Sequence, residues 1–139
     1  MATTRSVRPL TSSLDAIEVI LTLLDREPGT TLAALVDHLP GQGRTVVPVA
    51  GGDPGPAGAP ALAELIAGAL PGDTSARLVL VSVRDHGGEA PAEGDLAAWR
   101  TLGRRARGWS LELLDWFVVT DEAILSLAEL AGPAARWDG

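Results

Sequence analysis

The residues of this sequence that could carry out chemistry gather in one stretch, from Ser82 to Asp95. His86 follows Asp85 in a glycine-rich loop, and Asp95 starts the next predicted helix. A neighbouring carboxylate can orient an imidazole for proton transfer, but a histidine in such a loop can equally be an exposed side chain. Ser82 lies inside a predicted strand with no base beside it, which favours a small buried residue over a nucleophile. The other histidine, His38, is expected in a solvated hairpin loop.

The composition narrows the classes of protein to consider. The chain has 139 residues and a formal net charge of −7, which argues against broad contact with nucleic acid or anionic membranes. It contains no cysteine, so no thiolate nucleophile or ligand is available, and a cytoplasmic location is expected. The apolar stretch 14–24 is too short and too charged to span a bilayer. Abundant Ala, Gly, Pro and Arg suggest a GC-rich, bacterial genome.

Hydrophobic spacing and turn residues predict one α/β domain, a mixed β-sheet flanked by helices. We expect a disordered arm over residues 1–10, the folded domain over 11–132 and a C-terminal tail over 133–139, with fraying from residue 128. Residues 51–60 (GGDPGPAGAP) are predicted to form a flexible, proline-stiffened connector rather than a phosphate-binding loop, since no Lys-Ser/Thr pair follows. The predicted elements, in order, are a helix before Pro28, strands at Thr30–Asp37 and Arg44–Ala50, a helix at Ala61–Leu70, a strand at Arg77–Arg84, a helix at Asp95–Arg107, and strands at Leu111–Thr120 and Ala123–Leu127. The strands starting at Arg77 and Leu111 are expected to be neighbours in one sheet, with the intervening helix packed on it.

Residues 77–132 resemble the end of the RadC branch of the JAB (JAMM, MPN) metalloprotease family. The likeness rests on the strand LVLV at 78–81, the helix start AEGD at 92–95, the strand LLDWFVV at 113–119 and the end SLAEL at 126–130. Upstream, LVD at 35–37 resembles the first LLD strand of the family, which extends the likeness to about residues 27–132. The resemblance implies a JAB-like domain in which His-x-His and a downstream Asp hold zinc, a Ser supports the site and an earlier Glu is the general base.

Under this resemblance most of the metal site is missing. Counting back from Asp95, the two histidine positions hold Ser82 and Arg84, and the serine position holds Ala92, so only Asp95 remains of the zinc ligands. Glu27 is the nearest candidate for the general base. A guanidinium has no lone pair for a metal and repels a cation, so zinc is expected to be absent. Arg84 is expected to pair with Asp95 instead.

The resemblance therefore implies a catalytically inactive, RadC-like JAB domain that acts as a binding or scaffold module without a cofactor. An alternative is a metal-independent enzyme that acts on a small molecule through the loop around Asp85, His86 and Asp95. A third is a zinc-dependent peptidase in which a slipped loop moves His86 into the second histidine position. The expected partner is a protein or a small-molecule ligand, and not nucleic acid or a membrane; a homodimer is left open.

Overall fold

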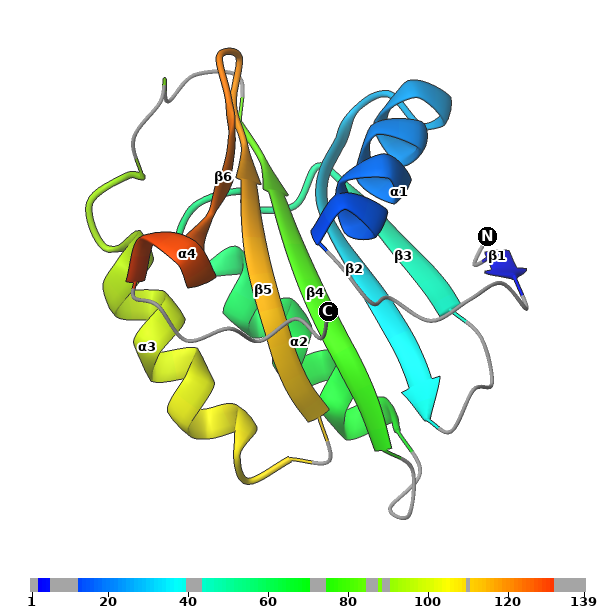
Figure 1. Cartoon of the computed structure of the whole chain (residues 1–139), viewed down its shortest axis with the longest axis vertical. Coiled ribbons are helices and arrows are strands. Elements are labelled where there is room, and N and C mark those ends of the chain that lie inside the picture. Colours follow the sequence, from blue (N-terminus) through cyan, green and yellow to red (C-terminus); the bar gives the residue numbers. More distant parts are fainter. Residues whose placement is uncertain are drawn as a thin grey trace.

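Two strands of almost continuously apolar sequence form the centre of the fold (Figure 1). They are β4 (Ser75–Val83) and β5 (Leu111–Val119), which pair in parallel. Parallel neighbours need a crossover, and α3 (Asp95–Ala106) supplies it. The prediction that these two strands are neighbours in one sheet, with the intervening helix packed against it, is confirmed.

The computed structural model describes residues 3–5, 13–39, 44–70, 75–84, 88, 91–109 and 111–131. Within them, the sheet has the strand order β1-β3-β2-β4-β5-β6, and every pair except β4/β5 is antiparallel. The predicted α/β domain with a mixed sheet flanked by helices is confirmed. No helix in these ranges is long and apolar enough to cross a membrane. The remaining elements are β1 (Thr3–Arg5), α1 (Ser13–Arg26), β2 (Thr30–Leu39), β3 (Arg44–Ala50), α2 (Gly58–Ala69), β6 (Ile124–Ser126) and α4 (Leu127–Ala131).

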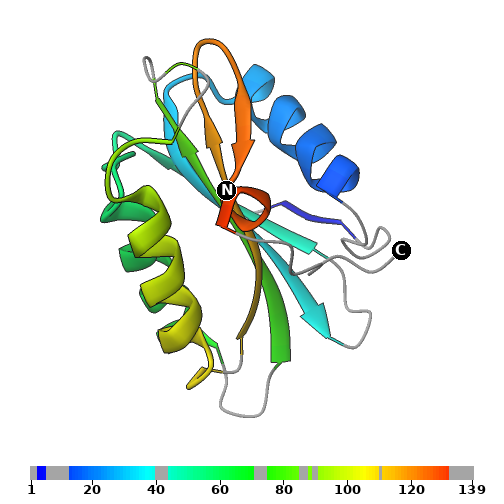
Figure 2. The same cartoon turned by 60° about the vertical axis from the view of Figure 1, so that its left-hand side comes forward.

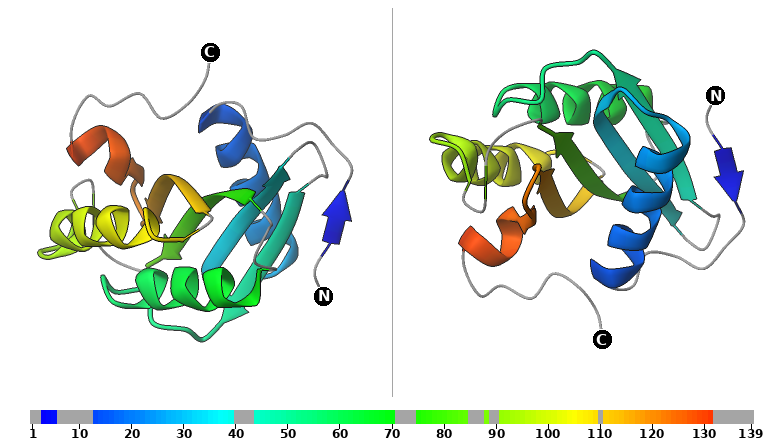
Figure 3. Two further views of the ribbon diagram at one scale, coloured as in Figure 1. Left: turned by 90° about the horizontal axis from the view of Figure 1, so that it is seen from below. Right: turned by 90° about the horizontal axis from the view of Figure 1, so that it is seen from above.

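The sheet separates two hydrophobic clusters, because successive side chains of a strand point to opposite faces. Leu78 and Leu80 of β4 pack into the cluster shared with α2 and α3. Val79 and Val81 pack into the cluster shared with α1. Figures 2 and 3 show the resulting layers, with α1 on one side of the sheet and α2 on the other. Burial on both faces explains why β4 reads as a continuous apolar run rather than as an alternating one.

The structure differs from the sequence-based expectation at three element ends. Thr3–Arg5, expected in a disordered arm, forms β1 on β3, whose outer edge offers backbone groups for pairing. β2 continues to Leu39, so His38 lies opposite Ala76 of β4 and not in the hairpin loop. The helix expected from Ala61 begins at Gly58. The other residues of 1–10, except 3–5, and the tail 133–139 lie outside the described residues.

The expected fraying is wrong for residues 128–131, which belong to α4; residues 132–139 lie outside the described residues. Its cap comes from β5. The buried Asp115 carboxylate accepts hydrogen bonds from the Ala128 amide (3.1 Å), the Ser126 hydroxyl (2.5 Å) and the Trp116 amide (2.7 Å). The Ser126 hydroxyl oxygen in turn accepts a bond from the Glu129 amide (3.2 Å). Two side chains thus satisfy donors of the first turn, which stabilises so short a helix.

Replacing Asp115 by alanine is predicted to lower the free energy of unfolding by about 2–4 kcal/mol, since buried amides of Trp116 and Ala128 would lose their acceptor. Urea unfolding measures this change. The control is Glu122→Ala, which removes an exposed carboxylate from the nearby turn and should change stability by no more than about 0.5 kcal/mol. Equal effects of the two substitutions would contradict the assigned role of Asp115.

Candidate functional site

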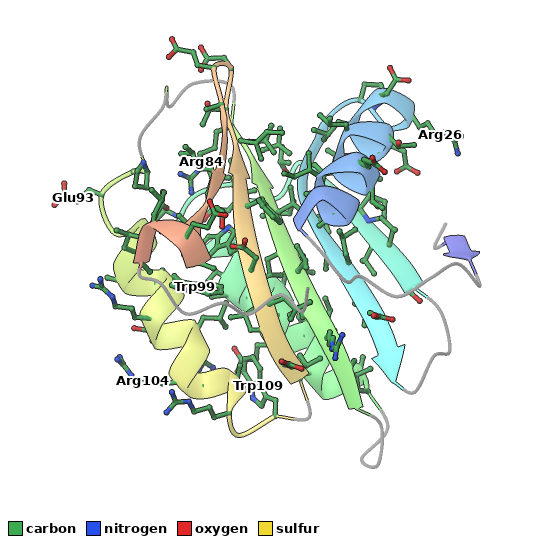
Figure 4. The ribbon with its side chains drawn as sticks, viewed as in Figure 1. Arg26, Arg84, Glu93, Trp99, Arg104 and Trp109 are labelled. Carbon is green, nitrogen blue, oxygen red and sulfur yellow. The ribbon has the colours of Figure 1, made fainter. Side chains whose placement is uncertain are left out.

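The end of β4 lies next to the start of α3, on the side of the sheet that α2 and α3 cover. Arg84 directly follows β4, and its amide donates to the Val119 carbonyl of β5 (2.8 Å), which fixes where its side chain leaves the sheet. Asp95 is the first residue of α3 and follows Gly94, whose φ of 90° lies in the left-handed region that favours glycine. Arg84 lies between the end of β4 and the start of α3 in Figure 4.

Arg84 and Asp95 form a bidentate ion pair. Nη1 of Arg84 donates to Oδ2 of Asp95 at 2.8 Å, and Nη2 donates to Oδ1 at 2.9 Å. The Asp95 side chain is fully buried, and only 12% of the Arg84 side chain is exposed. Two parallel bonds between a guanidinium and a carboxylate are among the strongest polar contacts in proteins. The prediction that these two residues approach each other is confirmed.

Backbone groups complete the surroundings of the pair. The Ala92 amide donates to Oδ2 of Asp95 (2.7 Å), and Nε of Arg84 donates to the Pro54 carbonyl (2.6 Å). Asp95 thus accepts three hydrogen bonds, out of about four that a carboxylate can accept. We call this group the ion-pair site: Arg84, Asp95, the Ala92 amide and the Pro54 carbonyl. With its charges mutually neutralised, it offers neither a metal ligand set nor an open acid or base.

The connector before α2 takes part in this site. Its carbonyls accept hydrogen bonds from Arg84 at Pro54 and from the Thr31 hydroxyl at Gly52 (2.8 Å). Within it, the Gly55 amide donates to Oδ1 of Asp53 (2.8 Å), which forms a local turn. The sequence analysis predicted a flexible connector. In the structure, hydrogen bonds attach this connector to Thr31 of β2 and to Arg84 at the end of β4.

Ser82 and Ala92 serve structural purposes. The fully buried Ser82 hydroxyl accepts a hydrogen bond from Nε1 of Trp116 (2.9 Å), which satisfies the buried indole. This agrees with the interpretation of Ser82 as a small buried residue. Ala92 contributes its amide to Asp95, a contact that does not depend on its side chain. The sequence analysis did not predict the hydrogen bond between Ser82 and Trp116, although both residues lie in the buried parts of neighbouring strands.

The other predicted site residues do not join the ion-pair site in the described part of the chain. Glu27 is exposed in the turn after α1, and its backbone carbonyl accepts a hydrogen bond from the Thr30 hydroxyl (2.7 Å). β2 starts at the end of the sheet where β4 finishes, so Glu27 lies at that end but faces solvent. Asp85 and His86 lie outside the described residues, and their proposed role stays a prediction.

Removing Arg84 is predicted to cost about 3–5 kcal/mol of stability, because Arg84→Ala leaves the buried Asp95 carboxylate without its cation. The double change Arg84→Ala/Asp95→Ala should cost less than Arg84→Ala alone, since no buried charge remains. Urea unfolding of the single and double variants measures the coupling between the two residues.

A matched control for this cycle is Arg105→Ala. Arg105 pairs with Glu64 at 3.0 Å, but both side chains are largely exposed, so this variant should lose no more than about 1 kcal/mol. Strictly additive effects of the Arg84 and Asp95 substitutions would show that the pair is energetically unimportant.

Two glycines of α2, Gly58 and Gly68, test the close contact between this helix and the connector. A Cβ on Gly58 would lie 1.7 Å from the Asp53 carbonyl oxygen, whereas a Cβ on Gly68 would meet nothing within 4 Å. Gly58→Ala should therefore destabilise the protein by roughly 2 kcal/mol or more, because the backbone must shift. Gly68→Ala should stabilise it by about 0.5–1 kcal/mol through helix propensity. Thermal unfolding of both variants checks the contrast, and equal midpoints would count against the close approach at Gly58.

Known proteins offer no further guide to this site. No family model, curated protein or solved structure matches the chain. Across the described residues, no group of three or more His, Asp or Glu side chains is arranged to hold a metal ion. The site therefore has to be interpreted from its own geometry.

Proposed function

We propose that this chain is a JAB-like domain, similar to the RadC branch, in which the Arg84–Asp95 ion pair stands where active members hold zinc. In this proposal the domain is catalytically inactive and acts as a binding or scaffold module. The observation that carries it is the bidentate pair, with distances of 2.8 and 2.9 Å, between two positions that the resemblance assigns to metal ligands.

The placement of three residues supports this proposal. Ser82 and Arg84 are two residues apart along the chain, as the two histidines of the His-x-His pattern would be, and Asp95 starts the following helix. Arg84 and Asp95 converge, as ligands of one ion would. A guanidinium supplies the positive charge of the missing ion but no lone pair and no open coordination position, both of which hydrolysis by zinc requires.

The alternatives use residues that the ion-pair site does not offer. A metal-independent enzyme would need Asp95 beside Asp85 and His86, yet both carboxylate oxygens of Asp95 already accept hydrogen bonds. A zinc peptidase with a slipped loop would need Asp95 as a ligand, in competition with a guanidinium. Both alternatives are therefore less well supported than a binding module. The proposed partner is a protein or a small molecule, in the cytoplasm.

Metal analysis tests the proposal directly. Protein purified without a histidine tag or chelator should contain far less than one zinc per chain. About one zinc per chain, lost in the variant Asp95→Ala, would instead establish a zinc enzyme and overturn the proposal.

A gain of metal binding would test whether the site derives from a zinc site. The double variant Ser82→His/Arg84→His restores the His-x-His pattern opposite Asp95, so zinc should raise its unfolding midpoint. The same variant with Asp95→Ala is the control and should respond much less. If bulk at buried Ser82 prevents folding, Arg84→His alone should still show a weaker zinc response that depends on Asp95. Folded variants that ignore zinc would argue against an ancestral metal site.

A further inference from the structure

Positive charge is concentrated in one short segment of this acidic chain. The chain has 11 basic and 18 acidic residues, and four of the basic ones lie between residues 100 and 107. Residues 96–111 contain no acidic residue, so this segment carries a charge of +4. The rest of the chain carries −11, since its seven basic residues stand against all 18 acidic ones. A positive region of this kind attracts anionic partners.

Three of these arginines form a stripe along α3. At about 100° per residue, Arg104 and Arg107 lie within about 60° of each other around the helix, with Arg100 between them. Arg107, the C-cap, keeps right-handed helical backbone angles (φ −62°, ψ −25°). All three are exposed, and Figure 4 shows Arg104 pointing away from the sheet. We call Arg100, Arg104 and Arg107 the arginine stripe, which extends over about 10 Å of helix.

The arginine stripe has no carboxylate partner in the part of the chain that the structure describes. The ion pairs there use other arginines. Arg104 donates a hydrogen bond to the Thr101 hydroxyl (3.3 Å). Arg105, by contrast, faces α2 and pairs with Glu64 at 3.0 Å. The three guanidinium groups of the stripe therefore keep most of their donors for a partner.

The helix itself gives only part of the reason for these arginines. The helix macrodipole favours a cation in the last turn, which accounts for Arg104 and Arg107. Arg100 lies a turn earlier, and like charges three and four residues apart on a helix repel each other. Because no acidic residue of α3 after Asp95 relieves this repulsion, the stripe lowers the stability of the free helix. Carboxylates of a partner would relieve it.

We propose that the arginine stripe is the docking surface for an acidic helix of another protein. Carboxylates at positions i, i+4 and i+7 of a helix repeat at the spacing of the three arginines, so a helix lying along α3 can pair with all of them. Guanidinium groups bind carboxylates through two parallel hydrogen bonds, and arginine is enriched at protein interfaces. This inference rests on the proposed role as a binding module, for which it names the chemistry of the partner, but it does not use the zinc argument.

The surroundings of the stripe favour a short acidic helix over other anionic partners. An extended nucleic acid would continue past the stripe onto a chain that otherwise carries −11. A second copy of this chain is a poorer match. The exposed side of its α1 offers the carboxylates of Glu18 and Asp25, but Arg26 directly follows them.

Titration of the full chain with a designed peptide tests this proposal. The probe is an alanine-based helical peptide with glutamates at positions i, i+4 and i+7, added at low ionic strength and followed through the backbone amide NMR signals of the protein. The largest changes should fall on residues 96–108. Arg104→Glu should weaken binding at least about fivefold. Arg26→Glu, the same change of charge on the exposed side of α1, is the matched control and should weaken binding less than about twofold.

A second variant makes the result independent of one substitution. Arg100→Gln removes one charge of the stripe without reversing it, so it should weaken binding in the same direction as Arg104→Glu, but less. Both side chains are exposed, so the urea midpoints of both variants should stay close to that of the unaltered chain. Unchanged peptide binding by both folded variants would overturn the assignment of the stripe.

The remaining outcomes identify a different occupant or none. Equal binding of a peptide of the same composition, with its glutamates spread around the helix, would overturn the match of spacing. Tighter binding of an oligothymidylate of about 12 nucleotides, lost in Arg104→Glu, would replace the acidic helix by nucleic acid. Self-association of the chain that Arg104→Glu abolishes would replace it by a second copy. No change up to about 5 mM peptide would overturn the docking surface altogether, while metal analysis still tests the inactive domain separately.

Discussion

Asp95 is a fully buried carboxylate, and the region around it is organised to compensate its lost hydration. Removing a carboxylate from water costs several kcal/mol even after relaxation, and only good geometry with further hydrogen bonds offsets that cost. Here Arg84 supplies the charge in a bidentate arrangement, and the Ala92 amide supplies a third bond. Because Arg84 also binds the Pro54 carbonyl, the same interaction holds together the end of β4, the start of α3 and the connector before α2.

A second buried carboxylate solves the same problem differently. Asp115, in the middle of β5, accepts hydrogen bonds from the amides of Trp116 and Ala128 and from the hydroxyl of Ser126. Its bonds go to the start of α4, where backbone amides would otherwise lack acceptors. Asp95 and Asp115 therefore each fix the beginning of a helix relative to the sheet, one through a guanidinium and the other through backbone donors.

The sequence allowed the central part of this fold to be predicted because the information there is local. The apolar runs at 77–84 and 111–119 are long enough to identify strands, and the single helical pattern between them requires a parallel crossover. The approach of Arg84 to Asp95 was predicted from the resemblance, which assigns both positions to ligands of one ion. The cap of α4 and the position of the connector could not be predicted, because each depends on a residue from another part of the chain. The cap of α4 comes from Asp115, eleven residues before Ser126, and the connector at Pro54 is held by Arg84, thirty residues later.

If, as proposed, Arg84 stands where JAB-type domains hold zinc, a guanidinium in that place removes the chemistry of the metal but keeps its structural role. A buried Asp at the start of α3 needs a positive partner, whether an ion or a side chain, for the strand and helix to converge. A bound ion with an open position can also activate water, whereas a guanidinium can only hold the carboxylate. The interior then contributes stability alone, and any binding activity has to come from the surface. The helices α1 and α2 lie on opposite sides of the sheet whose strands the ion-pair site anchors. A rigid centre of this kind keeps the two helices at a fixed separation and orientation.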